Sequence, residues 1–429
     1  MFPAASNTGL AKNTSYKVVL PFYMYAAVSF LAATILLFFS SSAFVQHYFH
    51  PQTLAVTHLM ALGWGTMMIL GASHQLVPVL IEGKLHSDIL AYLSFFSAAP
   101  GIPLLAYGFY NFYFGWEAQW GAILINAAVI FYLINIGISM VKSKKENVHA
   151  VFVFTATLWL LVTIVVGGFL VYNFSYNLLS EDSLHYLSLH AHLGIVGWFL
   201  LIALGVGSRL IPMFLISKYN NVKLLWRIYA LINFALISFI IIFLYIETSW
   251  FYFFPVAAIF IALLMFGYFC YKAYRGRLRK KVDDQLKISL LSVLMMLLPV
   301  IFLIVIVLSL LFSVDNPRLV LMYGFCIFFG WITAIIFGMT FKTLPFILWN
   351  KTYHTRAGIG KTPNPRELFS NKMFLWMAGV YLSGFVLFST GILVSNEIII
   401  QIAALLLTLA AIFYNANVFK MIMHKPKKT

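Results

Sequence analysis

The sequence from Leu187 to Phe214 reads LSLHAHLGIVGWFLLIALGVGSRLIPMF, and its Gly, Trp and Pro residues recur at two other places in the chain. In each copy a Gly precedes a Trp, a second Gly follows that Trp by seven residues, and a Pro follows it by fourteen. The three Trp residues are Trp64, Trp198 and Trp331. They are spaced by 134 and 133 residues, so one repeating unit is long enough for four transmembrane helices.

The Gly and Pro residues of this motif are first of all packing residues. The two Gly residues of a copy are eight positions apart, which places them on nearly one face of a helix. Small residues let transmembrane helices approach closely, and a Pro near the end of a span marks a kink or the exit of the helix. The motif therefore predicts architecture, and for these residues we favour a structural role.

The composition requires a membrane. Hydrophobic residues make up 62% of the 429 residues and charged residues only 9%, against about 25% charged residues in soluble domains. Twelve apolar runs are long enough to span a bilayer: 20–45, 53–80, 88–110, 118–141, 150–174, 187–214, 224–246, 251–272, 287–313, 319–348, 373–395 and 397–421. We expect an all-α fold of twelve transmembrane helices, arranged as three four-helix pseudo-repeats over about 10–141, 145–272 and 285–421.

The basic residues set the predicted orientation. The net charge is +16, and Lys and Arg lie before the first span, in the even-numbered loops and at the end of the chain, whereas the odd-numbered loops carry almost none, with Arg318 as the exception. By the positive-inside rule both termini are cytoplasmic, and we expect the inner membrane of a bacterium. These charges indicate topology and a lipid partner, not nucleic acid. They are Lys12, Lys17, Lys84, Lys142, Lys144, Lys145, Lys218, Lys223, Arg227, Arg275, Arg277, Arg279, Lys280, Lys281, Lys351, Arg356, Lys361, Arg366, Lys425, Lys427 and Lys428.

Three histidines within the spans are the candidate site residues. His58 and His192 each precede their Trp by six residues, and His190 belongs to the tripeptide His-Ala-His. Ionisable groups inside a membrane are costly and usually functional. Two neutral imidazoles at equal depth on facing helices suit the two axial positions of a haem iron. Alternatively, each imidazole hydrogen-bonds a carbonyl or hydroxyl group in the bundle.

His190 and His192 are separated by about 200° around a helix, so they point to different neighbours. One helix with this spacing does not bring two nitrogens to a single copper ion. Copper remains a second candidate cofactor. A further histidine, His74, lies toward the cytoplasmic end of its span, where we expect it at the headgroups. No CxxCH motif is present for covalent haem attachment.

Residues 190–198, HAHLGIVGW, resemble the HxHxGxxGW stretch in catalytic subunits of the C-type haem–copper oxidases, and His58 with Gly63-Trp64 looks like the single-His second helix of that superfamily. The resemblance implies twelve helices in three arcs of four. It implies that His58 and His192 ligate one b-type haem, and that His190 serves a second haem or a metal. The three-arc plan is also similar to NnrS-type haem and copper membrane proteins linked to the nitric oxide response.

The chain departs from the oxidase pattern in the histidines. The HxH lies on the sixth span instead of the tenth, where Tyr323 and Phe325 occupy its positions, and residues 224–272 contain no His. Reduction of O2 at a haem–copper centre is therefore not expected, and enzymatic activity is open. We expect a divergent haem–copper oxidase-like protein that binds b-type haem for electron transfer, or for binding or handling nitric oxide or another small gas.

Two other functions stay open. One is a transporter or assembly factor for haem, copper or a small solute, in which the histidines form a transient site. The other is a structural subunit of a respiratory complex that has lost its cofactor ligands. In each case the partners beyond lipid would be a redox protein or respiratory complex subunits.

Overall fold

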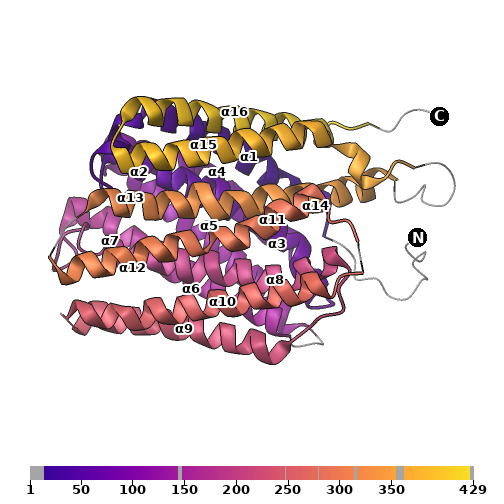
Figure 1. Ribbon diagram of the computed structural model, residues 1–429, viewed down its shortest axis with the longest axis horizontal. Helices are drawn as coiled ribbons and strands as arrows, with labels where there is room; N and C mark the ends of the chain where they lie inside the picture. Colours follow the sequence, from indigo (N-terminus) through magenta and orange to yellow (C-terminus); the bar gives the residue numbers. More distant parts are fainter. Residues whose placement is uncertain are drawn as a thin grey trace.

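The computed structural model describes residues 14–143, 147–246, 248–278, 280–313, 316–353 and 362–425. Within them, twelve helical spans are long and apolar enough to cross a membrane, and Figure 1 shows the helices running side by side along the long axis. Apart from an isolated bridge between Ser217 and Arg277, the described residues form no strand. The all-α prediction with twelve spans is confirmed, and large apolar side chains such as Phe96 and Phe234 are exposed on the outside, as a lipid-facing surface requires.

Nine of the described spans do not carry the Gly-Trp motif. Most are single helices, but a short 3₁₀ segment precedes α10, and the span of α11 and α12 is divided at Met296. The helices are α1 (Tyr16–Phe39), α4 (Asp88–Tyr110), α5 (Trp116–Val141), α6 (Val148–Tyr176), α9 (Val222–Tyr245), α10 (Phe253–Arg275), α11 (Asp284–Met295), α12 (Leu297–Leu311), α15 (Asn371–Val394) and α16 (Glu397–Ile422).

The other three spans carry the motif, and we call them motif spans one, two and three. Each contains a π-helical segment at its Gly-Trp pair, between two α-helical parts. Their parts are α2 (Pro51–His58), η2 (Leu59–Thr66) and α3 (Met67–Leu80); α7 (Leu187–His192), η3 (Leu193–Leu200) and α8 (Leu201–Leu215); and α13 (Pro317–Phe325), η5 (Cys326–Ile332) and α14 (Thr333–Tyr353). π-Helical turns inside α-helices are often found at functional sites.

Side-chain caps fix where several helices begin. Among them are six helices at which a polar Ser, Asn or Asp side chain, three residues before the bonded backbone N–H, accepts a hydrogen bond from that N–H, which has no partner within the helix. These caps are Ser87, Asn147, Asn221, Asp283, Ser370 and Asn396. Two of the capped turns are also held by an Asn on the following helix: Asn135 bonds both backbone groups of Ser87, and Asn417 does the same for Ser370.

The motif glycines are contact points between helices. A Cβ atom added to Gly71 would lie 2.6 Å from the Cβ of Phe22 on α1, and one added to Gly197 would lie 2.6 Å from the Cβ of Trp159 on α6. Real Cβ atoms do not approach so closely, so each motif span packs on the helix before it through glycine. This agrees with the packing role expected for these residues.

Hydrogen bonds between the motif tryptophans and threonines connect the three motif spans. Trp198 Nε1 donates to Thr66 Oγ1 at 3.1 Å, and Trp64 Nε1 donates to Thr333 Oγ1 at 3.1 Å. Each acceptor follows its own Trp by two residues, and the corresponding residue after Trp198 is Leu200. The bonds therefore run from span two to span one and from span one to span three.

The first and last spans are also neighbours, because the Asn415 side chain on α16 donates to the Ala27 carbonyl on α1 at 2.8 Å. The division into three repeats and the cytoplasmic orientation of the termini stay predictions. Several residues used for the orientation lie outside the described residues: Lys12, Lys144, Lys145, Arg279, Arg356, Lys361, Lys427 and Lys428.

Candidate functional site

His58 is the last residue of α2, and its imidazole is fixed on two sides. Its Nδ1 atom lies 2.8 Å from the Leu54 carbonyl oxygen, one helical turn earlier. The ring also stacks on Phe109 of α4, with centroids 4.2 Å apart and planes 19° apart. The third side, which carries Nε2, is left to face the neighbouring motif span.

His190 of α7 is held from the other direction. Its Nδ1 atom lies 3.1 Å from the carbonyl oxygen of Thr163 on α6. The ring sits over Gly167, where a Cβ atom would lie 2.7 Å from the imidazole Cε1. Gly167 therefore provides the room that the His190 imidazole occupies.

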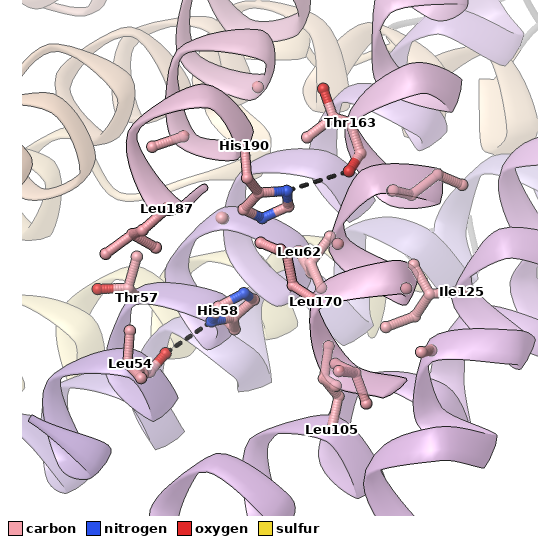
Figure 2. Close-up of a pocket in the computed structure, with 18 of the residues that line it drawn as sticks. Leu54, Thr57, His58, Leu62, Leu105, Ile125, Thr163, Leu170, Leu187 and His190 are labelled. Carbon is pink, nitrogen blue, oxygen red and sulfur yellow. Dashed lines mark hydrogen bonds between the residues drawn. The ribbon is translucent and has the colours of Figure 1, made fainter. Parts of the chain in front are cut away.

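The two imidazoles face each other across the boundary between motif spans one and two. Their centroids are 6.3 Å apart and their planes differ by 17°. Figure 2 shows each ring directing one nitrogen to a backbone carbonyl and the other toward the space between the rings. A carbonyl accepts hydrogen bonds only, so in both neutral rings Nδ1 carries the proton and Nε2 carries the free lone pair.

A cavity surrounds this His58–His190 pair. The free space, including the part open to the outside, is about 1180 Å³. The described residues of the wall are almost all apolar, and no Lys, Arg, Asp or Glu is among them. Its lining includes Leu54, Ala61, Leu62, Leu105, Phe109, Ala122, Ile125, Asn126, Gly167, Gly168, Leu170, Ala191 and Gly194.

His192 does not join the pair. Its Nδ1 atom lies 2.8 Å from the Ser188 carbonyl oxygen, and its ring lies near Phe239 and Tyr323, with centroids 4.8 and 5.8 Å away. It lines a separate cavity of about 880 Å³ between α7, α9, α10 and α12. The resemblance implied that His58 and His192 share one iron. The structure places His190 opposite His58 instead, because residues two apart on a helix point in nearly opposite directions.

The two cavities are related by position in the motif. His58 and His192 lie six residues before their Trp, whereas His190 and Tyr323 lie eight residues before theirs. We call the position six residues before the Trp the first position and the position eight residues before it the second. At both His58 and His192, the first-position residue of one motif span faces the second-position residue of the next. From the sequence we paired His58 with His192 because both lie six residues before their Trp, and so we missed this offset. The signal that was available is the residue eight positions before each Trp, which is His190 or Tyr323 in the second and third motif spans.

The third motif span differs at the first position. Phe325 occupies it and packs on Phe388 and Phe329, with ring centroids 4.3 and 5.1 Å away. Aromatic packing therefore takes the place of a metal-binding side chain there. Among the described residues, no three or more His, Cys, Asp or Glu side chains cluster closely enough to hold a metal ion, which leaves pairs of histidines as the candidate ligands.

The expectation that His74 lies at headgroup depth stays a prediction, whereas the structure defines what surrounds its side chain. Its side chain is fully buried between Phe22 of α1 and Tyr132 of α5, with ring centroids 5.3 and 5.4 Å away. Neither of its ring nitrogens has a hydrogen-bond partner. Position along the span gave its depth, but burial depends on two other helices that the local sequence does not specify.

Comparisons with known proteins agree with this architecture. No protein-family description matches the sequence, and no curated protein matches it. A solved structure that is similar is the cryo-EM structure of a haem–copper terminal oxidase dimer. It has 11% sequence identity and a TM-score of 0.65, over 97% of this chain and 86% of that one. At this identity the likeness concerns the fold, and this chain has a fold like subunit I of the haem–copper oxidases.

Proposed function

We propose that this protein binds one b-type haem between His58 and His190 and transfers electrons through it. The observation that carries the proposal is the orientation of the two rings. Both present an unprotonated Nε2 to the same space, while Nδ1 is held by the Leu54 and Thr163 carbonyls. Ligating histidines typically bond their second nitrogen to a carbonyl or carboxylate in this way, which fixes the ring and raises its basicity.

The spacing of the rings fits two axial ligands of one metal. Metal–imidazole bonds are about 2 Å long, so two rings on opposite sides of one ion have centroids ~6 Å apart. The observed separation is 6.3 Å. A lone copper ion would fit that gap too, but it needs no large apolar cavity. The space beside Gly167, Gly168 and Gly194 favours a flat macrocycle.

The presence of two histidine ligands favours one of the two expected haem functions, electron transfer or gas binding. With both axial positions occupied by the protein, a gas molecule has no open position on the iron. The haem would supply one-electron chemistry, while this chain positions it with His58 and His190 and excludes water with apolar walls. We therefore favour electron transfer over gas binding.

One observation favours a second function, a haem transporter or assembly factor. Among the residues that the structure describes, the cavity wall has no Lys or Arg that would pair with the two haem propionates. A haem without such partners would exchange more readily than one in a permanent redox centre. The rate of haem loss to an acceptor such as apomyoglobin separates the two functions, since slow loss supports electron transfer and rapid loss supports transport.

The experiment that tests the proposal is a reduced-minus-oxidised spectrum of the purified full-length protein, with haem measured as the pyridine complex. We expect one haem per chain in the wild type. His58→Ala and His190→Ala should each lose it, and His192→Ala, from the same tripeptide, should keep it. A wild type without haem would falsify the proposal, as would an unchanged spectrum in the double variant of His58 and His190.

A further inference from the structure

A second large cavity lies among α3, α8 and α14, the C-terminal parts of the three motif spans. Its free space, including the open part, is about 1590 Å³. Most of the wall is aliphatic, with Phe199 and Trp331 toward the π-helical segments. Phe199 also lines the cavity of the His58–His190 pair, so one side chain stands between the two spaces. We call this space the central cavity.

Three polar side chains line the central cavity at one position of the motif. Gln75, Arg209 and Lys342 each follow their motif Trp by eleven residues. Equal spacing on three neighbouring helices that are joined at their tryptophans places these side chains at similar depth. The cavity therefore has an apolar chamber and, farther along the same helices, a level with two cationic groups.

The two cationic side chains at this level differ in their partners. The described residues that line the cavity include no Asp or Glu. Lys342 is buried and bonds to Asp283 at 2.6 Å, and Arg366 bonds to the same carboxylate. Arg209 is exposed, and none of the described carboxylates forms an ion pair with it. The Arg209 guanidinium therefore stays available to an anionic group of a ligand that enters the cavity.

We propose that the central cavity binds an anionic amphiphile, a molecule with one carboxylate or phosphate head and an alkyl chain. The head pairs with Arg209, whose guanidinium can donate two parallel hydrogen bonds to either group. The chain lies between the aliphatic walls and extends toward Phe199 and Trp331. This ligand matches both properties of the cavity, whereas a small hydrated anion would gain nothing from the apolar wall and a neutral lipid nothing from Arg209.

The test is a binding assay on the full-length protein in a non-ionic detergent, with tritiated palmitate as the probe. We expect saturable binding that unlabelled palmitate displaces and uncharged hexadecanol does not. Arg209→Gln, which copies the residue of motif span one, should weaken binding about tenfold or more, since hydrogen bonds to a charged group are among the stronger ones. The matched control is Lys223→Gln, an exposed cation of α9 outside the cavity.

A second variant tests the chamber. Ala203 lines the cavity, and Ala203→Phe should abolish binding by filling the space that the alkyl chain needs, with size-exclusion chromatography as the check on folding. Competition by phosphatidylglycerol distinguishes the two sources. Strong displacement identifies a membrane phospholipid, and displacement by palmitate alone identifies a free fatty acid.

The proposal is overturned if Arg209→Gln binds palmitate as well as the wild type does, or if hexadecanol competes equally. This readout involves no haem, so its outcome is independent of the haem proposal.

Discussion

His58 and His192 lie in similar local surroundings, but a different side chain faces each of them. Each histidine ends an α-helical part directly before a π-helical segment, bonds its Nδ1 to a carbonyl four residues earlier, and lies against a Phe of the following helices. The facing residue is His190 in one cavity and Tyr323 in the other. One side chain on the neighbouring span therefore decides whether the cavity offers two imidazoles or one.

The Trp–Thr hydrogen bonds between motif spans also differ beside the two histidines. Next to the His58–His190 pair, Trp198 donates to Thr66 and joins motif spans one and two. The equivalent bond beside His192 would run from Trp331 to the position of Leu200, which has no acceptor. The interface between motif spans one and two, beside the histidine pair, thus contains a Trp–Thr hydrogen bond. The interface between motif spans two and three, beside His192, has packing in its place.

The largest effect is expected from His190→Tyr, which gives the first cavity the facing residue of the second. Replacing one of two imidazole ligands should remove most of the bound haem or move its absorption bands, because the phenol is a poor ligand for ferrous iron. Visible spectra of both redox states measure this. His192→Tyr is the matched control, and a spectrum changed only in that control would contradict the assignment of His190.

The reverse exchange, Tyr323→His, should give the second cavity a histidine pair. If the facing residue alone sets the chemistry, haem content rises from one toward two per chain. Haem-to-protein ratios by the pyridine assay measure the change, with Phe325→His as a control at the other position of the same span. An unchanged ratio would show that the space beside His190, with Gly167 beneath the ring, is needed as well.

Gly167→Ala should have an intermediate effect. The added Cβ would lie 2.7 Å from the His190 ring, so the ring must move, at a cost of about 1–3 kcal/mol for overpacking. We expect a shifted haem midpoint potential and faster haem loss. Gly137→Ala on α5 is the control, since its Cβ would meet only Phe154 at 3.4 Å, an ordinary contact outside the cavity. Equal behaviour of the two variants would argue against His190 as a ligand.

The smallest effect is expected from Leu200→Thr, which supplies the missing acceptor for Trp331. A new buried hydrogen bond contributes about 0.5–1.5 kcal/mol. It is offset by the packing lost when the buried Leu200 side chain is shortened, so the unfolding temperature should change little. Thr66→Val removes the existing bond at nearly unchanged side-chain volume and should lower the unfolding temperature. Thermal unfolding followed by intrinsic fluorescence measures both, and a larger loss in Leu200→Thr than in Thr66→Val would mean that the new hydroxyl does not reach the indole.

The sequence was sufficient to predict the membrane spans, but it was insufficient to predict which two histidines face each other. Apolar runs predict the helix ends closely, for example 88–110 against Asp88–Tyr110, because length and hydropathy are local properties. The three candidate histidines also follow from local spacing. Which two of these histidines face each other depends on how each helix is rotated and on the two-residue offset between facing positions of neighbouring motif spans. Neither property can be derived from the sequence of a single segment. The burial of His74 was missed for the same reason, since α1 and α5 cover it.

The π-helical segments have a consequence for how one helix serves two different spaces. A π turn accommodates an additional residue, so the side chains beyond it are rotated by about 100° relative to an uninterrupted α-helix. In motif span two, this phase shift lies between His190 and Arg209. The N-terminal part, α7, turns His190 toward motif span one, and the C-terminal part, α8, turns Arg209 toward the central cavity. A change in the length of this segment would rotate one half of the helix against the other and so alter both spaces together.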